Sequence, residues 1–150
     1  MTLFERIGPD ELRATVADFY ERIVRDVMIG FMFAGKDKQQ LIDREYELIA
    51  ALLGAKIKYT GRPMRTAHAQ HTIFGGQFER RMQLLREVFA DRGTDPDVAR
   101  AWLDHAESLR SQITRDRGSE CADPTTSGTT KLAMVVPAPD PEKPIKLGRR

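Results

Sequence analysis

The chain has 150 residues, a length that suits one domain and allows a continuous core to be buried. Its 24 basic and 22 acidic residues are interspersed and leave a net charge of +2, which argues against the strong electrostatic footprint of a nucleic-acid-binding protein. No run approaches the ~18 unbroken apolar residues that span a bilayer, and a lone cysteine, Cys121, cannot close an internal disulfide, so we expect a soluble cytoplasmic protein.

Two helix starts can be read at the beginning of the chain. Thr2 and Glu5 have the spacing of a capping box and predict a short opening helix that ends at Gly8. Pro9 then occupies a position where a first helical residue is favoured. Apolar residues at three- and four-residue steps predict that this second helix is amphipathic and runs to about Arg25.

A corner and a third long helix follow. The stretch 28–35 is apolar but bracketed by glycines, which predicts a tight corner packed on the core, with Phe33 buried. From about Lys38 the apolar residues again recur with helical spacing. Gly54 supplies the expected end of this helix, because glycine readily adopts the conformation that closes a helix.

Two further helices are predicted after Gly54. Thr60 and Pro63 predict the start of a short helix that carries His68. After a break at the Gly75-Gly76 pair, apolar residues at helical spacing predict another long helix, which ends near Gly93.

The last predicted helix starts at Asp95 and Pro96, a cap followed by a favoured first residue, and its apolar stripe extends to Ile113. The body of the chain is therefore expected to be all-α and to form one domain, residues 1–117. Residues 118–150 are rich in proline and threonine and offer little apolar surface to offset their ordering entropy. They predict a disordered tail.

The three histidines can be weighed one by one. His105 lies on the apolar stripe of the last helix, where a hydrogen-bonded core or boundary histidine is expected. His68 and His71 form a His-x-x-His pair, but no second cluster at ligand spacing completes a zinc site. A single histidine that faces several apolar helices instead fits haem iron, which needs one axial imidazole and a large apolar slot.

Five segments, in this order and with the right gaps, carry a resemblance to a known family: Leu3–Gly8, Asp18–Tyr20, Phe31–Gly35, Ala50–Gly54 and Tyr59–Met64. Over residues 2 to about 114 the chain resembles the truncated haemoglobins, most closely their first group. The resemblance implies a truncated two-over-two globin fold. It also implies a haem b cofactor, held noncovalently because the chain has no Cys-x-x-Cys-His motif.

The same resemblance implies roles for individual residues. His68 stands four residues after the Pro-Met pair, as the family's proximal iron ligand does, so it is preferred to His71. Tyr20 matches the family's distal tyrosine, whose phenol can donate a hydrogen bond to a bound gas and slow its release. Phe33 matches the aromatic residue that packs flat against the haem.

The distal side departs from the family pattern. Leu41, Arg44 and Glu45 are expected on the distal face of the third long helix, and in relatives the position of Glu45 is often glutamine. Glu45 could be protonated and donate to the ligand, pair with Arg44, or turn to solvent. We favour a Glu45 that turns to Arg44 or to the solvent edge, which leaves Tyr20 as the main donor. Arg81 is expected to be an arginine with a solvated guanidinium and with its stem on the haem edge or the core.

The remaining expected haem contacts fall into two sets. Side chains that surround the proximal segment and suit the haem propionates are Tyr59, Arg62 and Arg65. Apolar side chains expected to line the pocket or, equally well, to form core are Met64, Ile73, Phe78 and Met82.

The function implied is reversible binding of dioxygen, or of nitric oxide or carbon monoxide, at a five-coordinate haem iron, for storage, transport or scavenging. An enzymatic alternative is nitric oxide dioxygenase or peroxidase activity. Because the chain contains no reductase domain, that alternative requires a separate reductase partner. A third alternative is a haem-based gas sensor or a partner-binding role in which the tail makes the contact.

Overall fold

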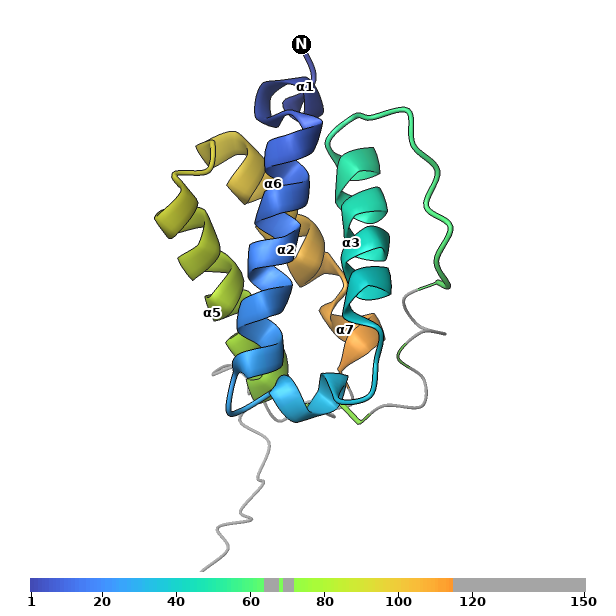
Figure 1. Ribbon diagram of the computed structural model, residues 1–150, viewed down its shortest axis with the longest axis vertical. Helices are drawn as coiled ribbons and strands as arrows, with labels where there is room; N and C mark the ends of the chain where they lie inside the picture. The colour runs from blue at the N-terminus through green and yellow to red at the C-terminus, as the bar shows by residue number, and fades with distance from the viewer. Residues whose placement is uncertain (64–67, 69–71, 115–150) are drawn as a thin grey trace, which may run out of the picture. The chain divides into compact units, whose positions relative to one another are not determined.

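Every regular element that the structure describes is a helix (Figure 1). In chain order the helices are α1 (Leu3–Ile7), α2 (Pro9–Arg25), the 3-10 helix η1 (Gly30–Phe33), α3 (Lys38–Leu52), α5 (Gly75–Arg92), α6 (Pro96–Ser108) and α7 (Arg110–Ile113). The structure is a computed structural model that describes residues 1–63, 68 and 72–114. The predicted all-α body is confirmed, whereas the predicted tail, residues 118–150, lies outside the described residues.

Local sequence signals account for several helix ends. The Thr2 hydroxyl accepts a hydrogen bond from the Glu5 amide at 3.1 Å, and the Glu5 carboxylate accepts one from the Thr2 amide at 2.8 Å, so the predicted capping box is confirmed. Pro9 is the first residue of α2. Gly93 ends α5 in the left-handed conformation, with φ of 61°, which glycine adopts without strain.

The last predicted helix is interrupted, which corrects the expectation of one continuous helix to Ile113. Helix α6 ends at Ser108, and α7 begins two residues later. The Ser108 hydroxyl donates to the backbone carbonyl of His105 at 2.6 Å, in the turn where α6 ends. A serine that bonds to the preceding turn competes with the regular helical ladder, which is consistent with the break.

The predicted break at the paired glycines is also wrong, because α5 begins at Gly75 itself. The Gln77 side chain accepts a hydrogen bond from the Phe74 amide at 2.9 Å and thereby caps the first turn of this helix. The short helix predicted to carry His68 lies mostly outside the described residues.

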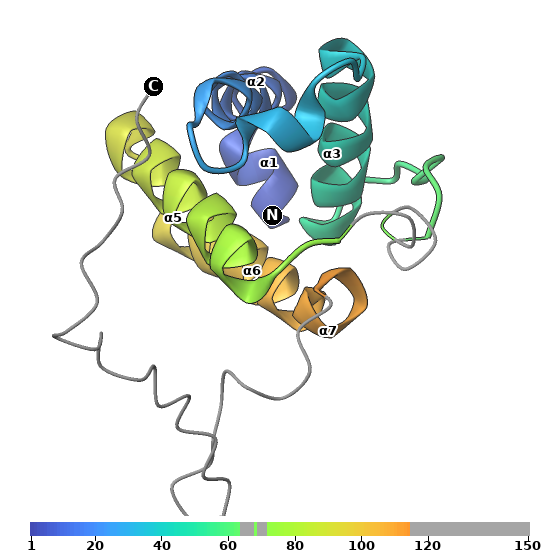
Figure 2. The same cartoon turned by 90° about the horizontal axis from the view of Figure 1, so that it is seen from below.

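Helix α2 packs against both α3 and α5, and α6 lies behind it (Figures 1 and 2). Its Phe19 is fully buried and meets Trp102 of α6 edge-to-face, with ring centroids 6.4 Å apart. Phe89 of α5 meets the same indole at 5.2 Å. This aromatic cluster joins α2, α5 and α6 in the core.

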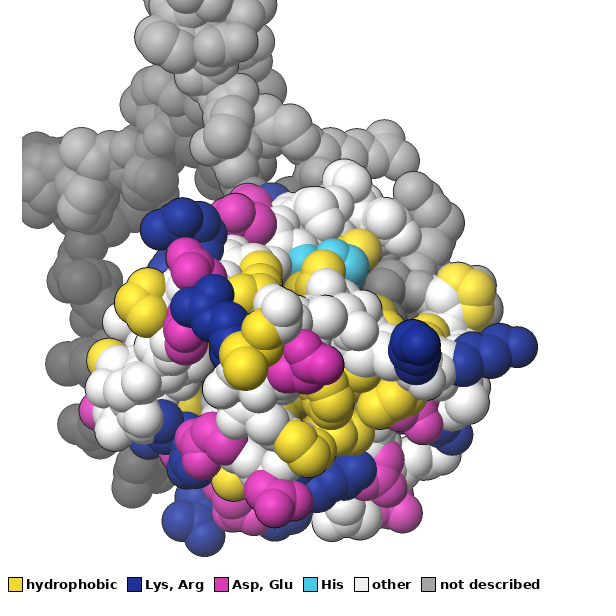
Figure 3. All heavy atoms as spheres, turned by 90° about the horizontal axis from the view of Figure 1, so that it is seen from above, with side chains coloured by type: hydrophobic (Ala, Val, Ile, Leu, Met, Phe, Trp, Pro, Cys, Tyr) yellow, Lys and Arg dark blue, Asp and Glu magenta, His cyan; other side chains and the backbone are white. Residues whose placement is uncertain are grey.

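The surface carries charges of both signs. Basic and acidic side chains interleave over the face shown in Figure 3. Many of them are paired: Arg22, for example, contacts Asp18 at 3.0 Å and Asp91 at 2.8 Å. In the described part of the chain, no helix has both the length and the apolar character required to cross a membrane.

The corner between α2 and α3 generates a stability prediction. A Cβ atom added at Gly30 would lie 2.7 Å from the backbone oxygen of Val24, so the backbone itself would have to move. We predict that Gly30→Ala lowers the free energy of unfolding by about 1–3 kcal/mol, as overpacking does elsewhere. Urea denaturation of the purified protein measures this loss.

Gly76→Ala is the matched control. A Cβ at Gly76 meets nothing within 4 Å, and the residue lies in the first turn of α5. Since alanine favours a helix more than glycine, the free energy of unfolding should stay constant or rise by up to about 1 kcal/mol. Equal losses in the two variants would contradict the close approach at Gly30.

Candidate functional site

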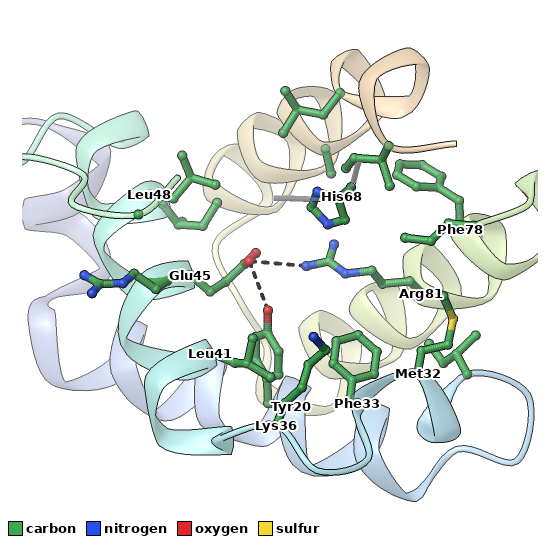
Figure 4. Close-up of a pocket in the computed structure, with 18 of the residues that line it drawn as sticks. Tyr20, Met32, Phe33, Lys36, Leu41, Glu45, Leu48, His68, Phe78 and Arg81 are labelled. Carbon is green, nitrogen blue, oxygen red and sulfur yellow. Dashed lines mark hydrogen bonds and ion pairs between the residues drawn. The ribbon is translucent and has the colours of Figure 1, made fainter. Parts of the chain in front are cut away.

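The helices enclose a cavity of about 330 Å³, within the size range of about 300–1,000 Å³ typical of ligand pockets. The residues proposed from the sequence that line it are Tyr20, Phe33, Leu41, Arg44, Glu45, Tyr59, Arg62, His68, Ile73 and Phe78. Met82, the other apolar candidate on α5, is buried in the core instead. Two further candidates, Met64 and Arg65, lie outside the described residues. Residues from distant parts of the chain therefore meet at one pocket (Figure 4).

An ion pair crosses this pocket. Arg81 of α5 and Glu45 of α3 point toward one another (Figure 4), with Nη2 of the arginine 3.2 Å from Oε2 of the glutamate. The Tyr20 hydroxyl donates to the same Oε2 at 3.4 Å. The two charged side chains are only 23% and 11% exposed, so the pair is largely screened from solvent.

The expected orientation of Glu45 is therefore wrong. Its partner is Arg81, whereas Arg44 contacts Glu47 at 3.4 Å and also bonds to the hydroxyl of Thr60. Consecutive residues of a helix point in different directions and do not face each other. Arg44 and Glu45 thus diverge, and the carboxylate turns into the pocket rather than to solvent.

The expectation that the Arg81 guanidinium is solvated is also wrong, although the side chain does lie against the core and the pocket. Its guanidinium lies over the Phe19 ring, 4.8 Å from the centroid, in addition to its contact with Glu45. The position of Arg81 in the sequence did indicate this burial. Arg81 stands three residues after Phe78 and four before Leu85, both buried, and so lies on the apolar stripe of α5.

The pair influences the ionisation of its neighbours. Burial raises the pKa of the Tyr20 phenol above its usual value, and the charge of Glu45 raises it further, while Arg81 opposes the shift. Burial tends to lower the pKa of Arg81, but the charge of Glu45 and the contact with Tyr20 hold it above its usual value. At neutral pH the pocket therefore contains a neutral phenol and a cationic guanidinium.

His68 is half-buried and lines the pocket. Figure 4 shows its imidazole on one side of the Glu45–Arg81 pair and Tyr20 on the other. His71, the alternative in the His-x-x-His pair, lies outside the described residues.

Phe33 is half-buried, which corrects the expectation of a buried side chain. It borders the cavity from η1, and its ring meets that of Tyr20 nearly at right angles, with centroids 6.3 Å apart. The Phe33 ring therefore packs against Tyr20 and also lines the pocket.

Two aromatic residues of α6 that were not assigned to the pocket from the sequence also line it, His105 and Trp102. His105 Nε2 and Trp102 Nε1 are buried, and neither has a hydrogen-bond partner within the described part of the chain. The expectation of a hydrogen-bonded His105 is therefore not met at Nε2. Both residues lie on the apolar stripe of α6. Their ring nitrogens, which are polar groups on an otherwise apolar face, are the feature of the sequence that could have indicated a pocket there.

The residues of the pocket fit a haem group. Haem requires apolar walls, an imidazole for the iron and a few polar groups around it. Phe33, Leu41 and Phe78 supply apolar wall, while His68 and Tyr20 supply an imidazole and a hydrogen-bond donor. Buried polar atoms that lack a protein partner are also expected where a bound group completes a site.

Comparison with known proteins agrees with this fit. The group 1 truncated haemoglobin GlbN of Nostoc commune is 26% identical over 113 residues, which cover 75% of this chain and 96% of that protein. GlbN of Mycolicibacterium paratuberculosis, also a group 1 truncated haemoglobin, is 35% identical over 68 residues. That second match covers 45% of this chain and half the length, 50%, of the relative.

Structural comparison identifies the fold. The crystal structure of a truncated haemoglobin from Tetrahymena pyriformis matches with a TM-score of 0.70 and 20% sequence identity, over 77% of this chain and 100% of that one. The predicted truncated two-over-two globin fold is thereby confirmed. The model of the bacterial-like globin family matches residues 2–115. The chain therefore belongs to the bacterial-like, truncated globins.

Proposed function

We propose that this globin holds haem b in its pocket and reversibly binds a diatomic gas, dioxygen above all, with His68 as the residue that would hold the iron and Tyr20 as hydrogen-bond donor. Family membership supports haem binding in general. The haem would supply the iron that coordinates the gas. One observation carries the proposal: His68 and Tyr20 reach a single, largely apolar cavity from different sides of the Glu45–Arg81 pair.

His68 would hold the iron through a neutral imidazole nitrogen. Its half-buried position suits this role, because the ring is accessible from the cavity yet shielded from bulk solvent. His105 also lines the cavity and is the competing ligand that an experiment has to distinguish.

Tyr20 would act on the gas ligand. Its raised pKa keeps the phenol protonated, and therefore able to donate, at neutral pH. Its present bond to Glu45 is 3.4 Å long, beyond the ~2.5–3.0 Å typical of O–H···O bonds. Such a weak bond allows the proton to be redirected to a ligand that carries partial negative charge, which slows the ligand's release.

The remaining candidates would position the cofactor. Leu41, Ile73 and Phe78 would contact its apolar faces. Tyr59 and Arg44 lie where the pocket meets solvent and would face the propionates, with Arg44 already oriented by Glu47 and Thr60. The roles of Met64 and Arg65 remain predictions from the sequence.

Replacement of the proposed axial ligand gives a direct test. We predict that His68→Gly abolishes the absorption spectrum of imidazole-ligated haem, because the axial nitrogen is lost. Added free imidazole should restore that spectrum by entering the space left by the side chain. Absorption spectra of the ferric, ferrous and carbonmonoxy forms provide the measurement.

His105→Ala is the matched control, since it removes the other described histidine of the same pocket. It should retain the spectrum of the unmodified protein. A spectrum that survives in His68→Gly without imidazole, but disappears in His105→Ala, would reverse the assignment of the ligand.

Tyr20→Phe tests the distal donor. Loss of one hydrogen bond to the ligand, worth about 1–2 kcal/mol, should raise the dissociation rate of dioxygen about five- to thirtyfold. Stopped-flow displacement of dioxygen by carbon monoxide measures that rate. Tyr46→Phe is the control, because Tyr46 is buried in the core and packs under Arg13. Equal dissociation rates in the two variants would argue against Tyr20 as the donor.

A further inference from the structure

We propose that the buried Glu45–Arg81 pair determines how strongly the pocket discriminates between charged and neutral ligands, with Arg81 strengthening the binding of a small anion such as azide and Glu45 weakening it. The inference rests on the proposed haem function, because the anion would bind as a ligand of the ferric haem. It extends that function by naming the two residues that set the affinity for charged ligands. It also assigns roles to an arginine and a glutamate that a site for neutral gases does not require.

Arg81 is a permanent positive charge held inside the pocket. The guanidinium lines the cavity, its side chain is 23% exposed, and its position is defined by the face of Phe19 at 4.8 Å. In a partly screened cavity a fixed charge acts on a ligand more strongly than it would in water. An anion that enters this cavity therefore meets a preorganised cation.

The contact with Glu45 leaves capacity for a second acceptor. The contact joins one arginine nitrogen, Nη2, to the carboxylate at 3.2 Å. It is therefore not the bidentate pair, with two parallel N–H···O bonds, that arginine often forms with a carboxylate. The guanidinium offers further N–H donors in a planar array. Arg81 can thus bind an anion while its bond to Glu45 persists, and Tyr20 adds a neutral O–H donor beside it.

The two charges of the pair have opposite effects on an anionic ligand. Arg81 attracts the anion, and Glu45 repels it from nearly the same position. Removal of either residue leaves the other charge uncompensated. The structure therefore predicts affinity changes of opposite sign for the two substitutions, which a general loosening of the pocket would not produce.

The test is a titration of the ferric haem-loaded protein with azide, followed by absorbance. Arg81→Met should weaken azide binding at least about tenfold, and Glu45→Gln should strengthen it by a similar factor, as expected for a charge a few ångströms away under partial screening. The double variant should fall between the two. Binding of carbon monoxide, a neutral ligand, to the ferrous form should change by a smaller factor than azide binding and should not change in opposite directions in the two variants, because the ligand carries no net charge.

Arg86→Met is the matched control. It makes the same chemical change on the same helix, but Arg86 is exposed and does not line the pocket. Azide affinity should stay at the level of the unmodified protein. Arg81→Lys, which keeps the positive charge, should retain much of the affinity that Arg81→Met loses. If Arg81→Met does not fold, the test rests on the other two variants: azide affinity should rise in Glu45→Gln and be largely retained in Arg81→Lys.

Urea unfolding of the full chain gives a readout independent of ligand binding. In a double-mutant cycle, the combined variant should lose less stability than the sum of the Arg81→Met and Glu45→Gln losses, because no unpaired charge remains. An additive result would deny the coupling on which the inference depends.

Azide affinity that is unchanged in both variants, or that shifts in parallel with carbon monoxide affinity, would overturn the roles assigned to Arg81 and Glu45. A normal haem spectrum in those experiments would leave the proposed haem function standing. Absence of any haem spectrum in the unmodified protein would overturn both.

Discussion

The simultaneous packing of α2 against α3 and α5 determines where the pocket forms. Two consecutive residues of α2 have different surroundings. Phe19 packs in the core against Trp102, whereas Tyr20 lines the cavity. The rings of Phe19 and Tyr20 also contact each other, with centroids 5.7 Å apart. A change in the rotation of α2 would move both residues at once. Because α3 and α5 flank this helix on either side, the side chains that they send inward, Glu45 and Arg81, meet in front of Tyr20.

The Glu45–Arg81 pair gives the pocket its particular electrostatic character. A carboxylate that is only 11% exposed is unfavourable alone, and the guanidinium from another helix compensates it. The pair therefore links α3 to α5 across a cavity that is otherwise mainly apolar. A globin pocket of this kind presents a neutral donor, Tyr20, and a permanent cation to an incoming ligand. Neutral and anionic ligands are consequently expected to respond differently to changes in the same two residues.

Local signals in the sequence predicted much of the fold, because a helix end depends on a few neighbouring residues. The capping box at Thr2 and the start of α2 at Pro9 are examples.

The partners of Glu45 could not be predicted in this way. Glu45 and Arg81 are separated by 36 positions, and their pairing depends on how α3 and α5 face one another. Arg44 looked like the natural partner only because it is adjacent in sequence, although adjacent helical side chains diverge. The proposed ligand and donor, His68 and Tyr20, were assigned through the family resemblance rather than through periodicity, and lining residues such as Trp102 and His105 were not assigned at all.

Titration of the purified protein with haem shows whether the cavity holds one haem group. Trp102, the only tryptophan of the chain, lines the cavity and serves as an internal probe. A haem bound there should quench its fluorescence and produce a Soret band, with both signals saturating at one haem per chain. The Soret band should shift when the reduced protein is exposed to carbon monoxide. Signals that rise without saturation, or quenching without a Soret band that responds to carbon monoxide, would contradict the account.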